Sequence, residues 1–139
     1  MPQISTAISL LSSCLQTAQL DPPLREVGTA TDLPRPAYPH AVISVVEETF
    51  EPATAEAAAL VTISLGCSAG RLDDAQAAVR SLAHQVRRAL YASSGLSGAV
   101  RQLRVVRLRF GGEQDPAAVQ PVVSRAELLL ELKYCEPQL

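Results

Sequence analysis

Apolar residues recur at helical spacing near the start of the chain. Within residues 3–19 the apolar positions are Ile4, Ile8, Leu11, Leu15 and Ala18. This spacing gives an amphipathic helix, which the Asp21-Pro22-Pro23 break ends. Serine, threonine and glutamine fill the other face. Because a membrane-surface helix would carry lysine and arginine there, we expect this helix to pack against protein.

Residues 71–95 carry the strongest helical pattern in the sequence. Its apolar stripe is made of Val79, Leu82, Val86, Ala89 and Leu90. Asp73 or Asp74 can cap the N-terminus, and Gly95 closes the segment. Arg80, His84, Arg87 and Tyr91 follow one another on the opposite face.

Two segments show the period of a β-strand. Residues 40–50 are rich in β-branched side chains and apolar on both faces at their start, which is typical of a central strand. Residues 58–68 alternate between apolar and polar positions. The segments predict an antiparallel pair joined by a connection of about eight residues.

The segment VRQLRVVRLRF, residues 100–110, alternates with one interruption. Its apolar phase shifts between Val105 and Val106, as one extra residue in a strand would cause. Beyond that point Arg107 and Arg109 share one face, with Leu108 and Phe110 on the other.

Residues 126–134 combine helix-forming residues with a strand-like pattern. Leucine, glutamate and alanine favour a helix. However, one set of alternate positions is Leu128, Leu130, Leu132 and Tyr134, the other is Glu127, Leu129, Glu131 and Lys133, and Pro137 follows. Alternation decides for a strand. If this strand neighbours the arginine-rich one, Glu127 and Glu131 face Arg107 and Arg109.

These elements predict an α+β fold, with two helices packed on a largely antiparallel four-stranded sheet in the order α–β–β–α–β–β. We expect residues 1–139 to form a single domain. The proline-rich segment 20–40 is expected to be an extended, semi-rigid connection, and residues 111–123 a long polar loop.

The charges are divided unevenly along the chain. The net charge is only −2, which argues against a general nucleic-acid binder. Residues 71–110 hold eight arginines against Asp73 and Asp74, or +6, whereas the remainder carries −8. One part of the molecule can therefore attract another part of a neighbouring copy. The alternative is that the charges interleave within the folded chain.

No active site is evident in the sequence. His40 and His84 are the only histidines, and both are interpreted as structural or solvated. Neither a nucleophile elbow nor a phosphate-binding loop is present, and no cofactor is expected. Glu47 and Glu48 are adjacent, so in a strand they face opposite ways and cannot act as an acid–base pair.

The cysteines are odd in number and widely spaced. Cys14, Cys67 and Cys135 form neither a disulfide framework nor a metal-binding pattern. We expect them to be small buried residues in a reducing compartment. No apolar run reaches the roughly 20 residues needed to span a bilayer, so a membrane role is not expected.

Two other function classes stay open at this point. A nucleic-acid-associated protein could track phosphates with its arginines, although stacking on bases would need exposed aromatic residues beside them. A small enzyme of unrecognised type is the other alternative.

Several strings resemble the small tail terminator, or tail completion, proteins of long-tailed bacteriophages and gene transfer agents. They are PAYPH leading into AVISVVEE, then LVTISLGCS, DAQAAVRSLAHQVRRAL, LRVVRLRF and RAELLLELKY. The resemblance spans residues 36–135. The proline-rich segment is longer than this family's pattern, and residues 111–123 lack its Asp-Gly turn. These departures leave open another neck role, as a head–tail connector or stopper subunit.

The resemblance implies a ring, commonly a hexamer, that ends the tail tube and meets the head-completion proteins. It implies a virion protein of the tail or neck, assembled in the host cytoplasm, with the tail tube protein and a stopper protein as partners. A closed ring needs heterologous contacts between copies, which the divided charge can supply. The expected interface residues are Arg80, Arg87, Arg104, Arg107, Arg109, Glu113 and Asp115.

Overall fold

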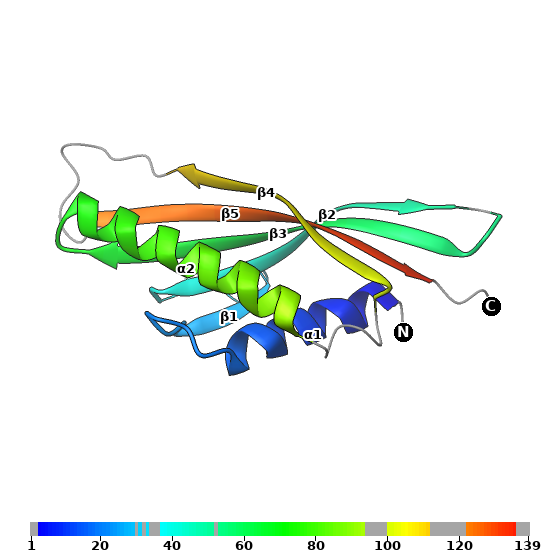
Figure 1. Cartoon of the computed structure of the whole chain (residues 1–139), viewed down its shortest axis with the longest axis horizontal. Coiled ribbons are helices and arrows are strands. Elements are labelled where there is room, and N and C mark those ends of the chain that lie inside the picture. The colour runs from blue at the N-terminus through cyan, green and yellow to red at the C-terminus, as the bar shows by residue number, and fades with distance from the viewer. Residues whose placement is uncertain are drawn as a thin grey trace.

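The computed structural model describes residues 3–29, 31, 33, 37–51, 53–93, 100–111 and 122–135. Its elements, in chain order, are α1 (Gln3–Thr17), β1 (Glu26–Thr29), β2 (His40–Phe50), β3 (Glu56–Ala69), α2 (Leu72–Ala92), β4 (Gln102–Gly111) and β5 (Val122–Cys135). Figure 1 shows both helices on one side of a long, twisted sheet. Among the described residues, no helix is long and apolar enough to cross a membrane.

The sheet has five strands in the order β1-β2-β3-β5-β4. β1 pairs with β2 in parallel, and the remaining neighbours are antiparallel. The predicted fold class is therefore wrong: the sheet is mixed and five-stranded, and the element order is α–β–β–β–α–β–β.

The missed strand lies within the proline-rich connection. Glu26–Thr29 is a proline-free stretch between Pro23 and Pro34, so its backbone N–H groups can join a ladder. It pairs with His40–Ile43 at the start of β2. Four residues are too few for a periodic signal, and a parallel partner reached through a proline-rich connection has no turn signature.

The strand prediction for the C-terminal segment is confirmed, because Val122–Cys135 forms β5. β5 lies in the interior of the sheet, between β3 and β4. Leu128, Leu130 and Leu132 are fully buried on one face. Their burial outweighs the helix propensity of the same residues, because propensity differences are small beside the gain from burying a leucine.

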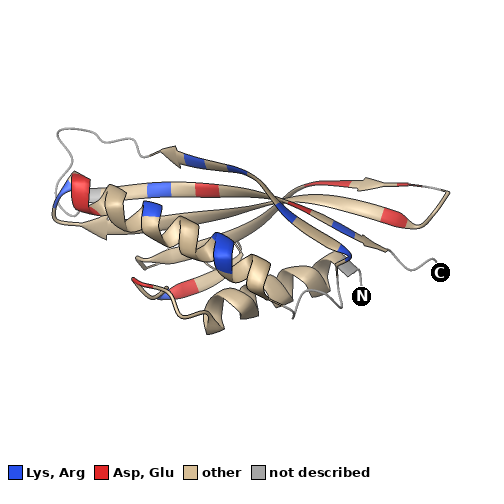
Figure 2. Ribbon diagram, viewed as in Figure 1, with Lys and Arg blue, Asp and Glu red and all other residues tan. Residues whose placement is uncertain are grey.

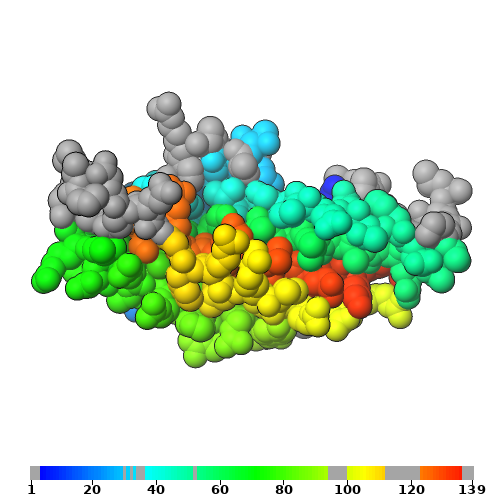
Figure 3. Space-filling model, turned by 90° about the horizontal axis from the view of Figure 1, so that it is seen from above, coloured from blue at the N-terminus to red at the C-terminus, as the bar shows by residue number. Residues whose placement is uncertain are grey.

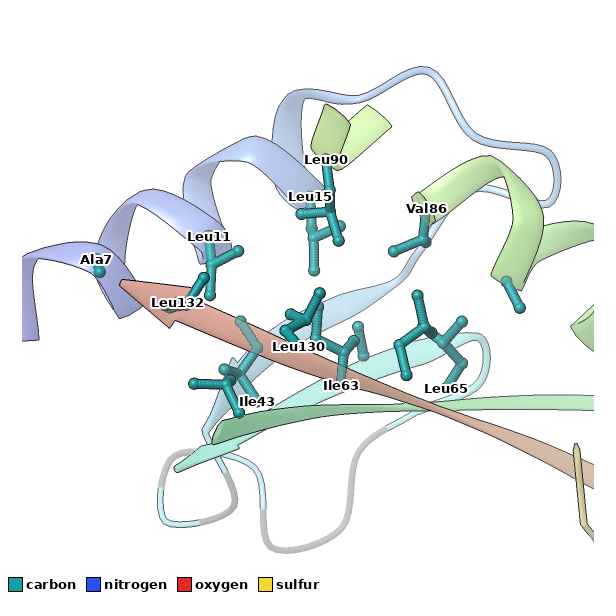
Figure 4. Packing of buried hydrophobic residues seen from close by; sticks show 14 of the residues in the cluster. Ala7, Leu11, Leu15, Ile43, Ile63, Leu65, Val86, Leu90, Leu130 and Leu132 are labelled. Carbon is teal, nitrogen blue, oxygen red and sulfur yellow. The ribbon is translucent and has the colours of Figure 1, made fainter. Parts of the chain in front are cut away.

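The core lies between this face of the sheet and the two helices (Figure 4). Leu11 and Leu15 of α1, and Val86 and Leu90 of α2, point towards the sheet. They meet side chains from its three long inner strands, among them Ile43 of β2, Ile63 and Leu65 of β3, and Leu130 and Leu132 of β5. Alanines at the contact, such as Ala7 and Ala83, are fully buried and allow close approach.

Two strands contain an irregularity in register. β4 shifts against β5 between Val105 and Arg107, which confirms the predicted extra residue. β2 shifts against β3 between Val45 and Glu47, which the sequence did not predict. In Figure 1 the C-terminal half of β2 and the N-terminal half of β3 project beyond the helices as a hairpin, which we call the arm. The arm ends in a turn where Ala55 has a φ of 59°.

Candidate interaction surface

The face of the sheet away from the helices carries no described helix or strand (Figure 3). In the registers of the four long strands, residues aligned across this outer face form rows. One row is Glu47, Leu60, Glu131 and Arg104; the next is Ser44, Thr62, Leu129 and Arg107; a third is Val42, Ser64, Glu127 and Arg109. In these rows the charged side chains lie on β4 and β5, apart from Glu47 on β2, and the other positions on β2 and β3 are small or apolar.

The bulge in β4 brings three arginines onto this outer face. Leu103, Val105 and Leu108 pack against the core, and the extra residue at 106 leaves Arg104, Arg107 and Arg109 all on the opposite side. Without the bulge, strict alternation would place Arg104 on the other face from Arg107 and Arg109.

The arginines differ in their partners across the sheet. Arg104 forms an ion pair with Glu131, with Nη2 and Oε1 3.5 Å apart. Arg109 lies opposite Glu127, and Arg107 lies opposite Leu129. The prediction that the two glutamates face arginines of β4 is therefore right for Arg109, which faces Glu127, and wrong for Arg107. Glu131 faces Arg104 instead. Within the part of the chain that the structure describes, Arg107 and Arg109 make no ion pair.

A further arginine ties the strand to the arm. Arg101 Nη1 lies 2.8 Å from Glu56 Oε1 and 3.7 Å from Cys135 Sγ. These neighbours raise the pKa of Arg101, the contact with Cys135 first and Glu56 second. The group stays charged either way, and such an exposed pair contributes little to stability.

The two predicted helix arginines lie on a different side of the molecule. The Arg80 guanidinium sits 5.3 Å from the centre of the Phe110 ring, and His84 is the ring's other neighbour at 6.4 Å between centroids. Arg87 is exposed on α2. Glu113 and Asp115 lie outside the described residues. The five predicted residues that the structure describes therefore lie on two sides of the molecule.

An acidic edge on β2 was missed by sequence reasoning. β1 covers only His40–Ile43, so the remainder of β2, from Ser44 to Phe50, has no strand partner on that side among the described residues. This segment and the turn after it carry Glu47, Glu48 and Glu51. Figure 2 shows acidic residues on this arm and basic residues along β4. The acidic run was visible in the sequence, but its place at an edge was not.

A histidine is packed into the other end of the same outer face. His40 is buried, with its ring 4.9 Å from that of Tyr38, and Nδ1 has no hydrogen-bond partner among the described residues. Burial lowers the pKa of His40 below its ordinary 6.5, and the positive charge of Arg125 adds to this. A neutral ring packed in this way has the surroundings of a structural histidine.

The cysteines are not uniformly buried. Cys67 lies in the core, and burial raises the pKa of its thiol to about 11. Cys14 is half-buried and Cys135 is exposed, so the expectation of burial is wrong for Cys135. In the described segments, no group of three or more metal-ligating side chains comes together.

An open hollow of about 560 Å³ lies beside the arm. Among its lining residues are Phe50, Glu56, Arg101 and Tyr134. The Tyr134 hydroxyl lies 3.4 Å from Glu48 Oε1. Arg101 and Glu56, which form an ion pair, both line the hollow. The described residues that line the hollow include neither histidine nor cysteine. This set of groups does not form a nucleophile–base pair.

No protein-family model matches the chain, and no curated protein matches it. Among solved structures, it is similar to a chain from the virion of a native gene transfer agent particle. The two share 16% sequence identity over 96% of this chain and 92% of that one, with a TM-score of 0.34. At that score the match does not establish a common fold.

Proposed function

We propose that this chain is a structural virion protein, a tail terminator that forms a ring, caps the tail tube and joins it to the head-completion proteins of the neck. The observation that carries the proposal is the solvated outer face of the sheet, where Arg104, Arg107 and Arg109 stand in line on β4. Two of these three have no ion-pair partner among the described residues.

An arginine row of this kind suits contact with protein. Arginine makes planar, bidentate contacts with carboxylates, and acidic side chains lie on the same sheet in the adjacent strand and on the arm. Phe110, the one aromatic residue of β4, lies against Arg80 and His84 of α2. The arginine row therefore lacks an aromatic side chain of its own strand on which a base could stack.

The sequence resemblance supplies the kind of assembly. The resembled family forms rings, commonly hexamers, and a ring places every copy's surface in the same contact. One exposed ion pair contributes only about 0–1 kcal/mol, but the contribution recurs at each interface around the ring. The proposed partners are further copies, the tail tube protein and a stopper protein, in a virion assembled in the host cytoplasm, with no cofactor.

The test combines electron microscopy with charge reversal. Purified protein should form closed rings in negative stain, and adding it to growing tail tubes should stop their elongation. Arg107→Glu with Arg109→Glu should abolish the rings in sedimentation velocity while circular dichroism stays unchanged, because like charges then meet at each interface. Arg71→Glu with Arg88→Glu changes the net charge equally on exposed positions of the α2 region and should leave rings intact.

Three results would contradict the proposal. One is a wild-type protein that stays monomeric and leaves tube growth unaffected. Another is a doubly reversed β4 variant that still forms normal rings. The third is tight, strongly salt-dependent DNA binding that is lost with Arg107 and Arg109, which would indicate a phosphate-tracking role instead. Rings that bind neck proteins but never cap tubes would indicate a connector or stopper.

A further inference from the structure

Among the described residues, two long stretches of strand on opposite sides of the sheet have no strand partner on their outer side, and they carry opposite charge. β4 is the last strand on one side. It presents Arg104, Arg107 and Arg109, and Arg101 lies just before it. On the other side, β2 from Ser44 to Phe50 lies beyond the reach of β1. It presents Glu47 and Glu48, with Glu51 following.

Exposed apolar side chains gather on the same two edges. Of the six large apolar or aromatic residues that are strongly exposed in the described part of the chain, five lie on the edge strands. They are Val45, Val46 and Phe50 on β2, and Val106 and Phe110 on β4. An uncovered edge that also exposes apolar side chains is a ready site for adding another strand.

From this pairing of edges we infer that the chain assembles edge to edge: β4 of one copy pairs with the Ser44–Phe50 segment of β2 in the next. The partner is a second copy of this chain. The inference deepens the proposed function, because it rests on the chain forming a ring and names the strands that meet in it.

The strand directions fit this pairing. β2 and β5 are both antiparallel to β3, and β4 is antiparallel to β5, so β2 and β4 run in opposite directions. When successive copies point the same way along a ring axis, β4 of one copy meets β2 of the next as an antiparallel pair. The contact joins two different surfaces, as a closed ring requires.

The faces fit as well. Glu47 lies on the outer face, in the same row as Leu60 and Arg104 of its own copy. A neighbouring β4 would continue that face with Arg107 and Arg109. Val45, Glu48 and Phe50 lie on the helix side, because each pairs with a buried residue of β3. There they would meet Leu108 and Phe110, which pair with buried residues of β5.

The charges also decide which edges meet. Two β4 edges would place arginines against arginines, and two β2 edges would place glutamates against glutamates, so only the unlike combination is attractive. Charged and bulged edges often serve only to prevent sheet pairing. Charge of either sign would protect an edge from pairing. Here one edge is basic and the other acidic, so the two edges attract each other.

One β4 donor is already occupied within the chain. The Val105 N–H donates to the Tyr91 hydroxyl at 2.9 Å. We therefore place the ladder C-terminal to that residue, along Val106–Gly111. This stretch and Ser44–Phe50 are each about as long as an ordinary β-strand.

The test is reciprocal rescue between two variants. Arg107→Glu with Arg109→Glu makes the β4 edge acidic, and Glu47→Arg with Glu51→Arg makes the β2 edge basic. Each variant alone should lose the ring peak in sedimentation velocity, because one of its edges then repels the next copy. An equimolar mixture should recover rings with an even number of copies in alternation, and so should one chain carrying all four changes.

Hydrogen exchange adds a second measurement. The backbone amides of Ser44–Phe50 that point away from β3, and those of Val106–Gly111 that point away from β5, should be protected in wild-type rings and exchange rapidly in either monomeric variant. Amides of α2 should keep the same protection in both states, and circular dichroism should match the wild type. The Arg71→Glu, Arg88→Glu variant controls for the change in net charge.

The outcomes separate this inference from the proposed function. Rings that cap tubes, combined with a folded Glu47→Arg, Glu51→Arg variant that still assembles or a mixture that never recovers, would overturn edge pairing and leave the terminator role standing. Recovery of rings that never cap tubes would support edge pairing and count against the role. A wild-type chain that never self-associates would overturn both.

Discussion

At the residue scale, the sheet leaves little room where His40 meets Gly66. The two residues pair across β2 and β3, and the His40 ring lies over the place where a larger residue at 66 would put its side chain. A Cβ at Gly66 would lie 2.7 Å from His40 Cε1 and 3.0 Å from Tyr38 Cε1. The predicted strand 58–68 includes this glycine, and the structure shows that it makes room there for a ring.

Replacing Gly66 with alanine should therefore destabilise the fold. Because the buried ring has little space to move, we expect the free energy of unfolding to fall by about 1–3 kcal/mol, the usual cost of overpacking. Urea denaturation of the monomer measures this. Gly111→Ala is the matched control, since a Cβ there meets nothing within 4 Å. Equal stability of the two variants would show that the His40 ring moves aside freely.

At the element scale, β5 organises the molecule. It lies between β3 and β4, contributes three fully buried leucines to the core, and carries Glu127 and Glu131 on the outer face. Successive side chains of β5 therefore point alternately to the core and to the outer face of the sheet. One face holds the helices, and the other sets acidic groups beside the arginines of β4.

The two faces of β5 should respond differently to truncation. Leu130→Ala removes a side chain with no exposed area and should lower the free energy of unfolding by about 2–5 kcal/mol, through lost burial and the cavity left behind. Leu129→Ala removes a half-buried side chain from the outer face and should cost about 1 kcal/mol or less. Denaturant unfolding, at concentrations where the chain is monomeric, measures both. Similar losses would contradict the assignment of faces.

At the scale of the whole molecule, the sheet is asymmetric from edge to edge. The basic edge is β4, and the acidic one is the part of β2 that projects with the arm beyond the helices (Figures 1 and 2). A molecule with unlike edges tends towards closed rings or open filaments rather than two-fold dimers. Curvature, which the bulges in β2 and β4 help to set, decides between the two.

Ring formation should consequently depend on salt. Raising the salt concentration from about 0.1 M to about 1 M shortens the screening length from about 10 Å to about 3 Å. We expect slower association and a higher dissociation constant at high salt, because attraction between the edges is screened. Light scattering after dilution follows this directly. Stronger assembly at high salt would mean that apolar contacts, rather than charge, drive it.

The sequence by itself determined the periodic features of the protein. Alternation and helical spacing placed both helices and four of the strands, and even located the bulge at Val105 and Val106, because side-chain period reports directly on which face is buried. The arginines of β4 were visible for the same reason. The sequence did not determine which strands pair. The pairing of β1 with β2, and the position of β5 between β3 and β4, depend on contacts between distant segments that no local pattern encodes. Only the tertiary structure decided which strands lie at the edges, and so brought the glutamates of β2 into view as a counterpart to the arginines.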